Sequence, residues 1–465
     1  MSVAARRRFL APLALAQFIC SFAGSNMNVM INDITDDLNT TVTGVQATIT
    51  LFLLTMAILM IPCSKLTDRW GRKRCFILGL GLYGVGAVLS AVSPGLGVLI
   101  LGNSLFEGVG TAFLIPPVYI LTTLAFSDLT SRAKAFGVIS GMGGIGAAAG
   151  PLIGGVITSA ISWRAAFVFQ ALVIVTIILL SRRIVDPLPA DPTRPFDALG
   201  AVLSAVGMFF VVFGILQADQ DVALMVVFLA VGAVFLAWFF LYLRSRERSG
   251  REALLSLTLF RNRVSNLALV TQNVQWLLLM GTSFTVAVFL QTERGYDAIQ
   301  TGVVFTAATL GILGSSLAAE RLAKRYAQKT LIATGFVVTA AGIVVLLALV
   351  GASSRIVAFG PGLLLIGIGL GVMLTPSVNV VQSAFPEEQQ GEISGLSRSV
   401  SNLGSTFGTA IAGTILVSDL ASGNGTYVAA MLVLAAFAFV GLVAAIRLPG
   451  AARPAPATPR PAAAA

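Results

Sequence analysis

The stretch Ser64-Lys-Leu-Thr-Asp-Arg-Trp-Gly-Arg-Lys-Arg74 lies between two long apolar runs and carries five basic residues and one acid, Asp68. Short clusters of Lys and Arg are typical of the cytoplasmic loops that join membrane helices. Each flanking run is long enough to cross about 30 Å of hydrocarbon as a helix. The stretch therefore predicts a cytoplasmic turn between two membrane-spanning helices.

The composition of the whole chain indicates a membrane protein. Of 465 residues, 56% are hydrophobic and only 11% are charged. Helices satisfy their backbone hydrogen bonds internally in lipid, so we expect an all-α polytopic fold. The net charge of +10 falls in short patches between the apolar runs, which favours membrane topology over nucleic-acid binding.

The sequence gives little support for an enzyme. It contains no His, and its cysteines, Cys20, Cys63 and Cys75, do not have the spacing of metal ligands. It also lacks an evident nucleophile–base pair or phosphate-binding loop. We expect no catalytic residues, no cofactor and no metal site.

The apolar runs predict fourteen membrane helices. Basic residues concentrate in alternate connections, Arg398 among them, which places both termini in the cytoplasm of a multi-pass protein of the cell membrane. The predicted spans are 9–31, 44–63, 75–95, 97–121, 135–158, 163–181, 199–217, 222–243, 265–290, 300–319, 330–350, 357–380, 393–417 and 427–446.

The spans divide into two halves of six helices with an extra pair between them. The runs 199–217 and 222–243 are almost free of polar residues, so we expect this pair at the periphery, facing lipid. The expected organisation is an N-terminal bundle, a proline-rich cytoplasmic linker, the extra pair with its connecting segment, a C-terminal bundle and a disordered cytoplasmic tail, over residues 1–181, 182–198, 199–264, 265–446 and 447–465.

The basic turn also resembles a family signature. Asp68, Arg69, Gly71, Arg72 and Lys73 match G-x-L-a-D-r-x-G-r-K, found between the second and third helices of the major facilitator superfamily, with Ser64 in place of the leading Gly. The resemblance implies a gate in which Asp68 engages a helix N-terminus and releases it as the halves rock. The alternative is a topogenic loop whose one acid offsets its bases.

A second motif narrows the resemblance. Gly146-Ala-Ala-Ala-Gly150-Pro151-Leu-Ile-Gly154-Gly155 matches g-x-x-x-G-P-x-x-G-G, the fifth-helix motif of the superfamily's exporters. Together with fourteen spans it resembles the fourteen-helix drug:proton antiporters over essentially the whole chain. Glycines four apart also let helices pack closely whatever the function. The resemblance implies an exporter of small lipophilic or amphipathic compounds that works by proton antiport and alternating access, and we expect it to act as a monomer.

Two departures from that family affect the coupling mechanism. Where its fourth helix has R-x-x-Q-G, this chain has Ser104-Leu-Phe-Glu107-Gly108, so the Arg is absent and the Gln has become an acid. In the first span, Ser25 and Asn28 keep the character of the D-x-T-x-x-N pattern, but its acid is lost. The family's coupling mechanism cannot be carried over unchanged.

Glu107 is the candidate for proton coupling. It lies about ten residues into its span, which at ~1.5 Å per residue places it near the middle of the membrane. An ionisable side chain there is costly and is a functional hypothesis by default. The alternative is a neutral Glu that hydrogen-bonds between helices as packing.

Polar residues at helical spacing predict a shared cavity, although such stripes can also form interhelical hydrogen bonds. With one acid and no buried base, this cavity would suit neutral or monocationic lipophilic compounds. Its expected lining is Gln17, Ser21, Phe22, Ser25, Asn28, Asn103, Phe106, Glu107, Thr111, Gln272, Gln275, Trp276, Asn379 and Gln382.

Two other functions stay open. The same fold could flip a lipid or lipid-like metabolite between leaflets, which would require gaps between helices that open to lipid. A non-transporting membrane sensor or assembly subunit is the second possibility, and ligand-stimulated proton flux would exclude it.

Overall fold

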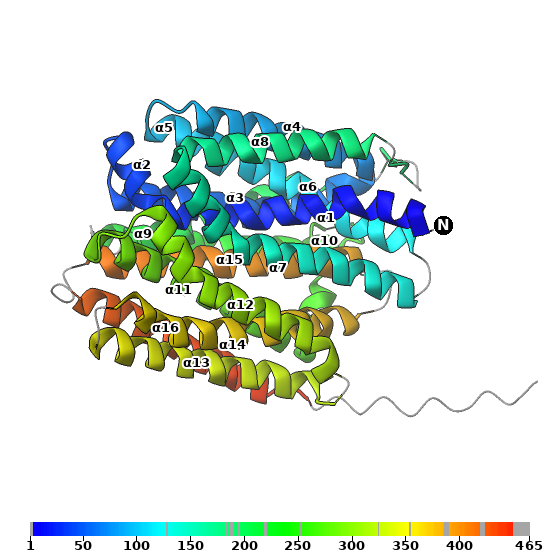
Figure 1. Ribbon diagram of the computed structural model, residues 1–465. Helices are drawn as coiled ribbons and strands as arrows, with labels where there is room; N and C mark the ends of the chain where they lie inside the picture. Colours follow the sequence, from blue (N-terminus) through cyan, green and yellow to red (C-terminus); the bar gives the residue numbers. More distant parts are fainter. Residues whose placement is uncertain are drawn as a thin grey trace, which may run out of the picture.

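The computed structural model describes residues 3–449 except 127–128, 183, 187–189, 194–195, 218–220, 252, 324, 353–354, 386–389 and 419–423. The described residues form helices and connecting turns without a strand, which confirms the predicted all-α fold. The N-terminal helices lie on one side of the molecule and the C-terminal helices on the other (Figure 1).

The N-terminal side consists of α1 (Val3–Asn26), η1 (Met27–Val29), α2 (Ile31–Asp37), α3 (Val42–Trp70), α4 (Arg72–Ala91), α5 (Leu96–Leu99), η2 (Ile100–Glu107), α6 (Gly108–Ala125), α7 (Leu129–Ala160) and α8 (Trp163–Ser181). The extra pair is α9 (Ala198–Leu216) and α10 (Val222–Arg248). The C-terminal side consists of η3 (Leu257–Arg261), α11 (Arg263–Val288), η4 (Phe289–Glu293), α12 (Ala298–Ala323), α13 (Gln328–Ala352), η5 (Ile356–Ala358), α14 (Phe359–Ser383), α15 (Gln390–Val417) and α16 (Gly425–Ile446).

Among the described residues, thirteen helical stretches are long and apolar enough to span a membrane. A fourteenth is obtained if the two pieces of α7, Gly141–Ala147 and Ala149–Ala160, which meet at 43°, are taken as one span. The bend lies just before Pro151, whose ring removes one backbone hydrogen bond of the helix.

The two sides meet along two helix pairs in the middle of the molecule, α3 with α15 and α7 with α12 (Figure 1). The pair α9–α10 packs on the first of these seams, where α9 contacts both α3 and α15. The Thr414 hydroxyl of α15 donates to the Ile215 carbonyl at 3.1 Å. In the most apolar stretch of α10 only 11% of the residues are buried, and in that of α9 33%, against 78% for α11 together with η4, so most of the surface of this pair is left for lipid.

The α3–α4 turn is tight because Gly71 adopts a φ of +94°, a conformation that disfavours any side chain. The next two backbone N–H groups, of Arg72 and Lys73, donate to the Asp186 carboxylate at 2.7 and 3.2 Å. A carboxylate at a helix N-terminus is favoured by the helix dipole. The signature turn is thus held by the segment that follows α8.

Candidate transport site

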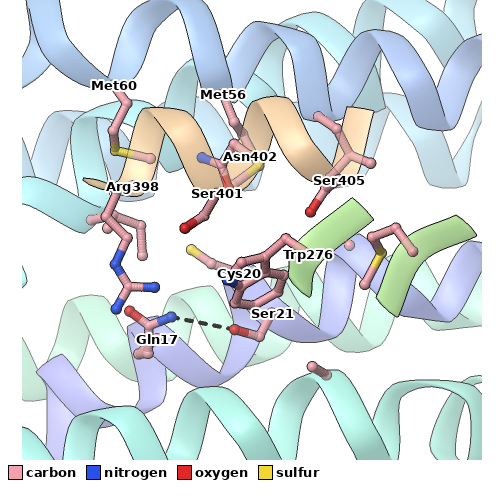
Figure 2. A pocket seen from close by; sticks show the side chains of 15 residues that line it. Gln17, Cys20, Ser21, Met56, Met60, Trp276, Arg398, Ser401, Asn402 and Ser405 are labelled. Atoms are coloured by element: carbon pink, nitrogen blue, oxygen red, sulfur yellow. Dashed lines mark hydrogen bonds between the residues drawn. The ribbon is translucent and has the colours of Figure 1, made fainter. Parts of the chain in front are cut away.

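A small pocket lies between the two sides, enclosed by α1, α3, α6, α7, α11 and α15, with a volume of about 50 Å³ (Figure 2). Gln17 and Ser21 of α1 and the residues of α15 supply its polar side chains, and α3, α6, α7 and α11 supply its apolar side chains. The lining residues are Gln17, Cys20, Ser21, Gly24, Leu53, Met56, Met60, Ile115, Ala147, Trp276, Met280, Arg398, Ser401, Asn402 and Ser405.

The pocket is smaller than the cavity that the sequence predicts, and most of its lining residues are different. Of the expected lining residues, Gln17, Ser21 and Trp276 are present. A ligand site for a drug-sized molecule needs roughly 300 Å³ or more. The structure is therefore a closed conformation that must widen to admit such a compound.

Arg398 lines the pocket, whereas the charge pattern of the sequence predicts a cytoplasmic loop base at this position and a cavity without a base. The helix α15 begins at Gln390, so Arg398 lies two turns inside it. Its guanidinium reaches from α15 toward the Gln17 amide of α1 (Figure 2). It donates to the Tyr119 hydroxyl and stacks over that ring, 4.6 Å from the centroid.

The expected stripe on α11 makes hydrogen bonds between helices instead of lining the pocket. The Ser397 hydroxyl donates to Gln272 at 2.8 Å, and the Ser377 hydroxyl donates to Gln275 at 2.9 Å. The Gln275 amide in turn donates to the Leu370 carbonyl at 3.2 Å. These bonds join α11 to α14 and α15, so this polar stripe forms interhelical hydrogen bonds, which is the alternative to a cavity lining.

The remaining predicted residues also lie outside the pocket lining. Ser25 donates to the Phe22 carbonyl of its own helix at 3.2 Å, and the Phe22 ring packs against Phe169. Asn379 on α14 is exposed. The others that do not line it are Asn28, Asn103, Phe106, Glu107, Thr111 and Gln382.

Glu107 is fully buried at the end of η2, a π-helical segment of eight residues, and does not line the pocket. Its carboxylate accepts hydrogen bonds from Ser90 and Asn103, both at 3.3 Å, and the Tyr83 hydroxyl also faces it. All three partners are neutral. On the pocket side, the Cys20 thiol lines the pocket and also contacts Thr111 beside this carboxyl.

Glycines bring α4 and η2 close enough to enclose Glu107. A Cβ added at Gly86 would lie 2.6 Å from the Gly102 carbonyl oxygen and 2.8 Å from the Glu107 side chain. A Cβ added at Gly102 would lie 2.6 Å from the Ser90 hydroxyl. The absence of these side chains lets α4 present Ser90 to the carboxyl.

Polar groups continue from Glu107 to the end of the molecule that carries α2 and α5, called here the acidic end. The Ser93 hydroxyl donates to the Ser90 carbonyl at 2.9 Å, and Arg164 donates to the Ser93 carbonyl at 2.9 Å. Arg164 also pairs with Asp37, to which the Trp163 indole donates at 3.0 Å. The hydrogen bond from Arg164 holds the pKa of Asp37 below its usual value of 3.8.

The acidic end is closed by contacts between the two sides. The Gln291 amide of η4 donates to the Asn28 carbonyl at 2.6 Å, and the Asn32 amide donates to the Gln291 carbonyl at 2.8 Å. The Ile299 backbone N–H at the start of α12 donates to the Ser159 hydroxyl of α7 at 3.0 Å.

The opposite end, which carries the Ser64–Arg74 turn, is called here the basic end and is closed along α3 and α15. Lys65 pairs with Glu392 across the two sides. The Ser399 hydroxyl donates to the Ala57 carbonyl at 2.5 Å. The side chain of Asp68, the predicted gate residue, lies outside the described residues.

The glycine motif of α7 packs on both sides of the molecule. A Cβ added at Gly146 or Gly150 would lie 2.3 Å from the Phe18 carbonyl oxygen or 2.1 Å from the Ser25 hydroxyl of α1. A Cβ added at Gly155 would lie 2.3 Å from the Ala298 carbonyl oxygen, next to α12. The glycines of the motif thus let α7 pack closely against α1 of its own half and against α12 of the other half.

Comparison with known proteins decides the family. The model of the Major Facilitator Superfamily matches residues 13–409 and again residues 268–465. This chain belongs to the major facilitator superfamily. It is therefore a multi-pass membrane protein of a family of transporters, built from two helical halves.

Several members of the superfamily resemble the chain along most of its length. The multidrug resistance protein Stp of Mycobacterium tuberculosis is 26% identical over 402 residues, 85% of this chain and 73% of its own. The puromycin resistance protein pur8 of Streptomyces alboniger is 28% identical over 411 residues, 87% of this chain and 81% of its own. The riboflavin transporter RibZ of Clostridioides difficile is 24% identical over 442 residues, 93% and 95% of the two chains.

A solved structure shows the same fold. The crystal structure of a mutant of the peptide transporter POT in complex with alafosfalin aligns with 94% of this chain and 94% of its own, with a TM-score of 0.69 at 14% sequence identity. At that identity the likeness concerns the arrangement of the helices.

Proposed function

We propose that this protein is a secondary active transporter that exports small lipophilic or amphipathic compounds from the cell by exchange with protons. The observation that carries the proposal is a central pocket closed at both ends by separate contacts between two halves. A transporter that opens to one side at a time needs such a pair of closures. The names of Stp and pur8 support export of drugs and antibiotics, whereas RibZ is named for a vitamin.

In this proposal the basic end faces the cytoplasm and both termini lie on that side. The Ser64–Arg74 turn and the bases that follow α12 lie at this end, as expected of loops that are not translocated. The chain would act as a monomer in the cell membrane, with Lys65 and Glu392 in the inner closure and Asn28, Asn32 and Gln291 in the outer one.

We assign proton coupling to Glu107. Its carboxyl is buried among neutral hydrogen-bond partners, so carrying a charge there is costly and a proton removes that cost. The groups from Ser90 through Ser93 to Arg164 form a polar path toward the outer face. Coupling would then act through α1 and α6, which carry Cys20 and Thr111 between Glu107 and the pocket.

Inverted membrane vesicles provide the test of the function. With an inward-acidic gradient, vesicles that contain the protein should accumulate a lipophilic dye, and a protonophore should abolish the accumulation. Vesicles that lack the protein provide the baseline. Uptake that equals this baseline would contradict transport, whereas uptake that survives the protonophore would contradict proton coupling alone.

A further inference from the structure

The pocket holds a positive charge without a matching acid. None of its fifteen lining residues is Asp or Glu, and among the ion pairs of the described residues none involves Arg398. A cation in a membrane-spanning bundle is costly unless an anion or several acceptors face it. Arg398 meets a hydroxyl and the face of a ring, both neutral.

A chain of hydrogen bonds holds the Arg398 guanidinium beside the pocket. The Tyr119 hydroxyl accepts from Arg398 and donates to the Gln17 side-chain oxygen at 3.3 Å, and the Gln17 amide donates to Ser21 at 3.3 Å. A guanidinium has five N–H donors in a planar fork. The single bond to Tyr119 leaves most of them for another acceptor.

A further donor lies one turn along α15. The Asn402 side-chain N–H group is buried and has no hydrogen-bond partner among the described residues, although Asn402 lines the same pocket. Buried donors of this kind are normally satisfied, so an unpaired one on a residue that lines the same pocket as Arg398 is available to a ligand acceptor.

The rest of the lining suits an apolar body. Met56, Met60 and Met280 line the pocket with Leu53, Ile115 and Trp276. Thioether side chains adapt to ligands of different shape, and an indole offers a flat apolar face.

We propose that the pocket binds lipophilic acids, in which one anionic group, such as a carboxylate or phenolate, is held by Arg398 and Asn402 while the apolar body contacts the methionines and Trp276. This inference rests on the proposed function and names its substrate class. It replaces the neutral or monocationic compounds expected from the sequence, because that expectation assumed a cavity without a base.

Three probes with one apolar body test the proposal: 1-pyrenebutanoate, 1-pyrenebutanol and 1-pyrenebutyl-trimethylammonium. Their dissociation constants are measured with the purified full-length protein in nanodiscs of zwitterionic lipid, by energy transfer from tryptophan to pyrene. The wild type should bind the acid about ten- to a hundredfold more tightly than the alcohol, as expected for a hydrogen-bonded charge, and the cation most weakly.

The variant Arg398→Gln should lose this preference for the acid while keeping its affinity for the alcohol. Arg398→Lys should retain part of the preference, because it keeps the charge and loses the planar fork. The control is Arg325→Gln, which removes an exposed Arg between α12 and α13 and should leave all three constants unchanged. Retained affinity for the alcohol shows that the Gln variant is folded.

Equal binding of acid and cation by the wild type, or a preference that survives Arg398→Gln, would overturn the proposal and leave the transport function standing. Failure of the wild type to bind or transport any of the three probes would overturn both. A second set of nanodiscs contains 30% anionic lipid. If this lipid displaces the acid from the wild type but leaves the residual binding of the acid to Arg398→Gln unchanged, the site holds a lipid headgroup, and the assignment to small acids is wrong.

Discussion

The Lys65 ammonium of α3 pairs with the Glu392 carboxylate of α15 across the two halves of the molecule, at the end of the bundle that carries the basic turn. Both side chains are about a quarter exposed. Lys65 belongs to the Ser64–Arg74 turn, but its partner is Glu392 of α15 and the pair does not involve Asp68. It therefore offers a closure of the basic end that can be tested by itself.

Reversal of one charge should open the basic end. We expect Lys65→Glu to increase the rate at which a maleimide labels Cys20, which lines the pocket, by a few-fold, because a partly exposed ion pair contributes about 0.2–1 kcal/mol. The measurement uses a Cys63→Ala, Cys75→Ala background, in which Cys20 is the single thiol. The exchanged pair Lys65→Glu, Glu392→Lys should restore the slow rate.

The control for this charge change is Lys329→Glu, at the start of α13 at the same end. It should label at the wild-type rate. A labelling rate for Lys65→Glu equal to that of the control would show that the pair does not hold the basic end closed.

Close packing of α7 on α1 depends on glycine at single positions. Gly146→Ala places a methyl group 2.3 Å from the Phe18 carbonyl oxygen, whereas Gly144→Ala places one in open space. We expect Gly146→Ala to lower the free energy of unfolding by ~1–3 kcal/mol and Gly144→Ala to leave it unchanged or slightly raised. Thermal unfolding in detergent measures the difference; equal melting temperatures would contradict the packing role.

Asp33 and Asp37 at the acidic end should give opposite pH dependences. Arg164 lowers the pKa of Asp37, so its contribution to stability is present above 3.8, the unfolded value, and is lost as the pH falls through the lower folded pKa. Partial burial, with Asp36 and Asp297 nearby, raises the pKa of Asp33. Its contribution is therefore full below 3.8 and is lost as the pH rises through the folded pKa.

Melting temperatures of the wild type, Asp33→Asn and Asp37→Asn, measured from about pH 3 to pH 7, check these signs. As the pH rises toward 3.8, the melting temperature of the wild type should increase relative to that of Asp37→Asn. As the pH rises above 3.8, it should decrease relative to that of Asp33→Asn. Parallel curves for the three proteins would contradict both assignments.

The helical fold follows from the sequence because membrane thickness sets a minimum length for each apolar run, and this constraint does not depend on tertiary packing. The lining of the pocket does depend on packing. The spacing of Gln272 and Gln275 places them on one helix face, but whether that face meets a cavity or Ser397 and Ser377 depends on the rotation of α11. A stripe of polar residues alone does not show whether a helix face lines a cavity or packs against another helix.

Arg398 shows a second limit. The predicted span 393–417 contains Arg398 five residues from its start, but the alternation of basic residues along the chain favours counting it among the loop bases. The start of α15 at Gln390 resolves this. A long side chain then carries the charge from α15 to Tyr119 in the opposite half.

Proton exchange in liposomes tests the central claim most directly. Purified wild type and Glu107→Gln are reconstituted with a pH-sensitive dye inside, a lipophilic trial substrate is added, and Asp36→Asn, which changes an exposed acid, serves as the control. We predict that the wild type and Asp36→Asn exchange substrate for protons, whereas Glu107→Gln binds substrate without proton flux. If Glu107→Gln exchanges substrate for protons at the wild-type rate, Glu107 is a packing residue and the proposed coupling site is wrong.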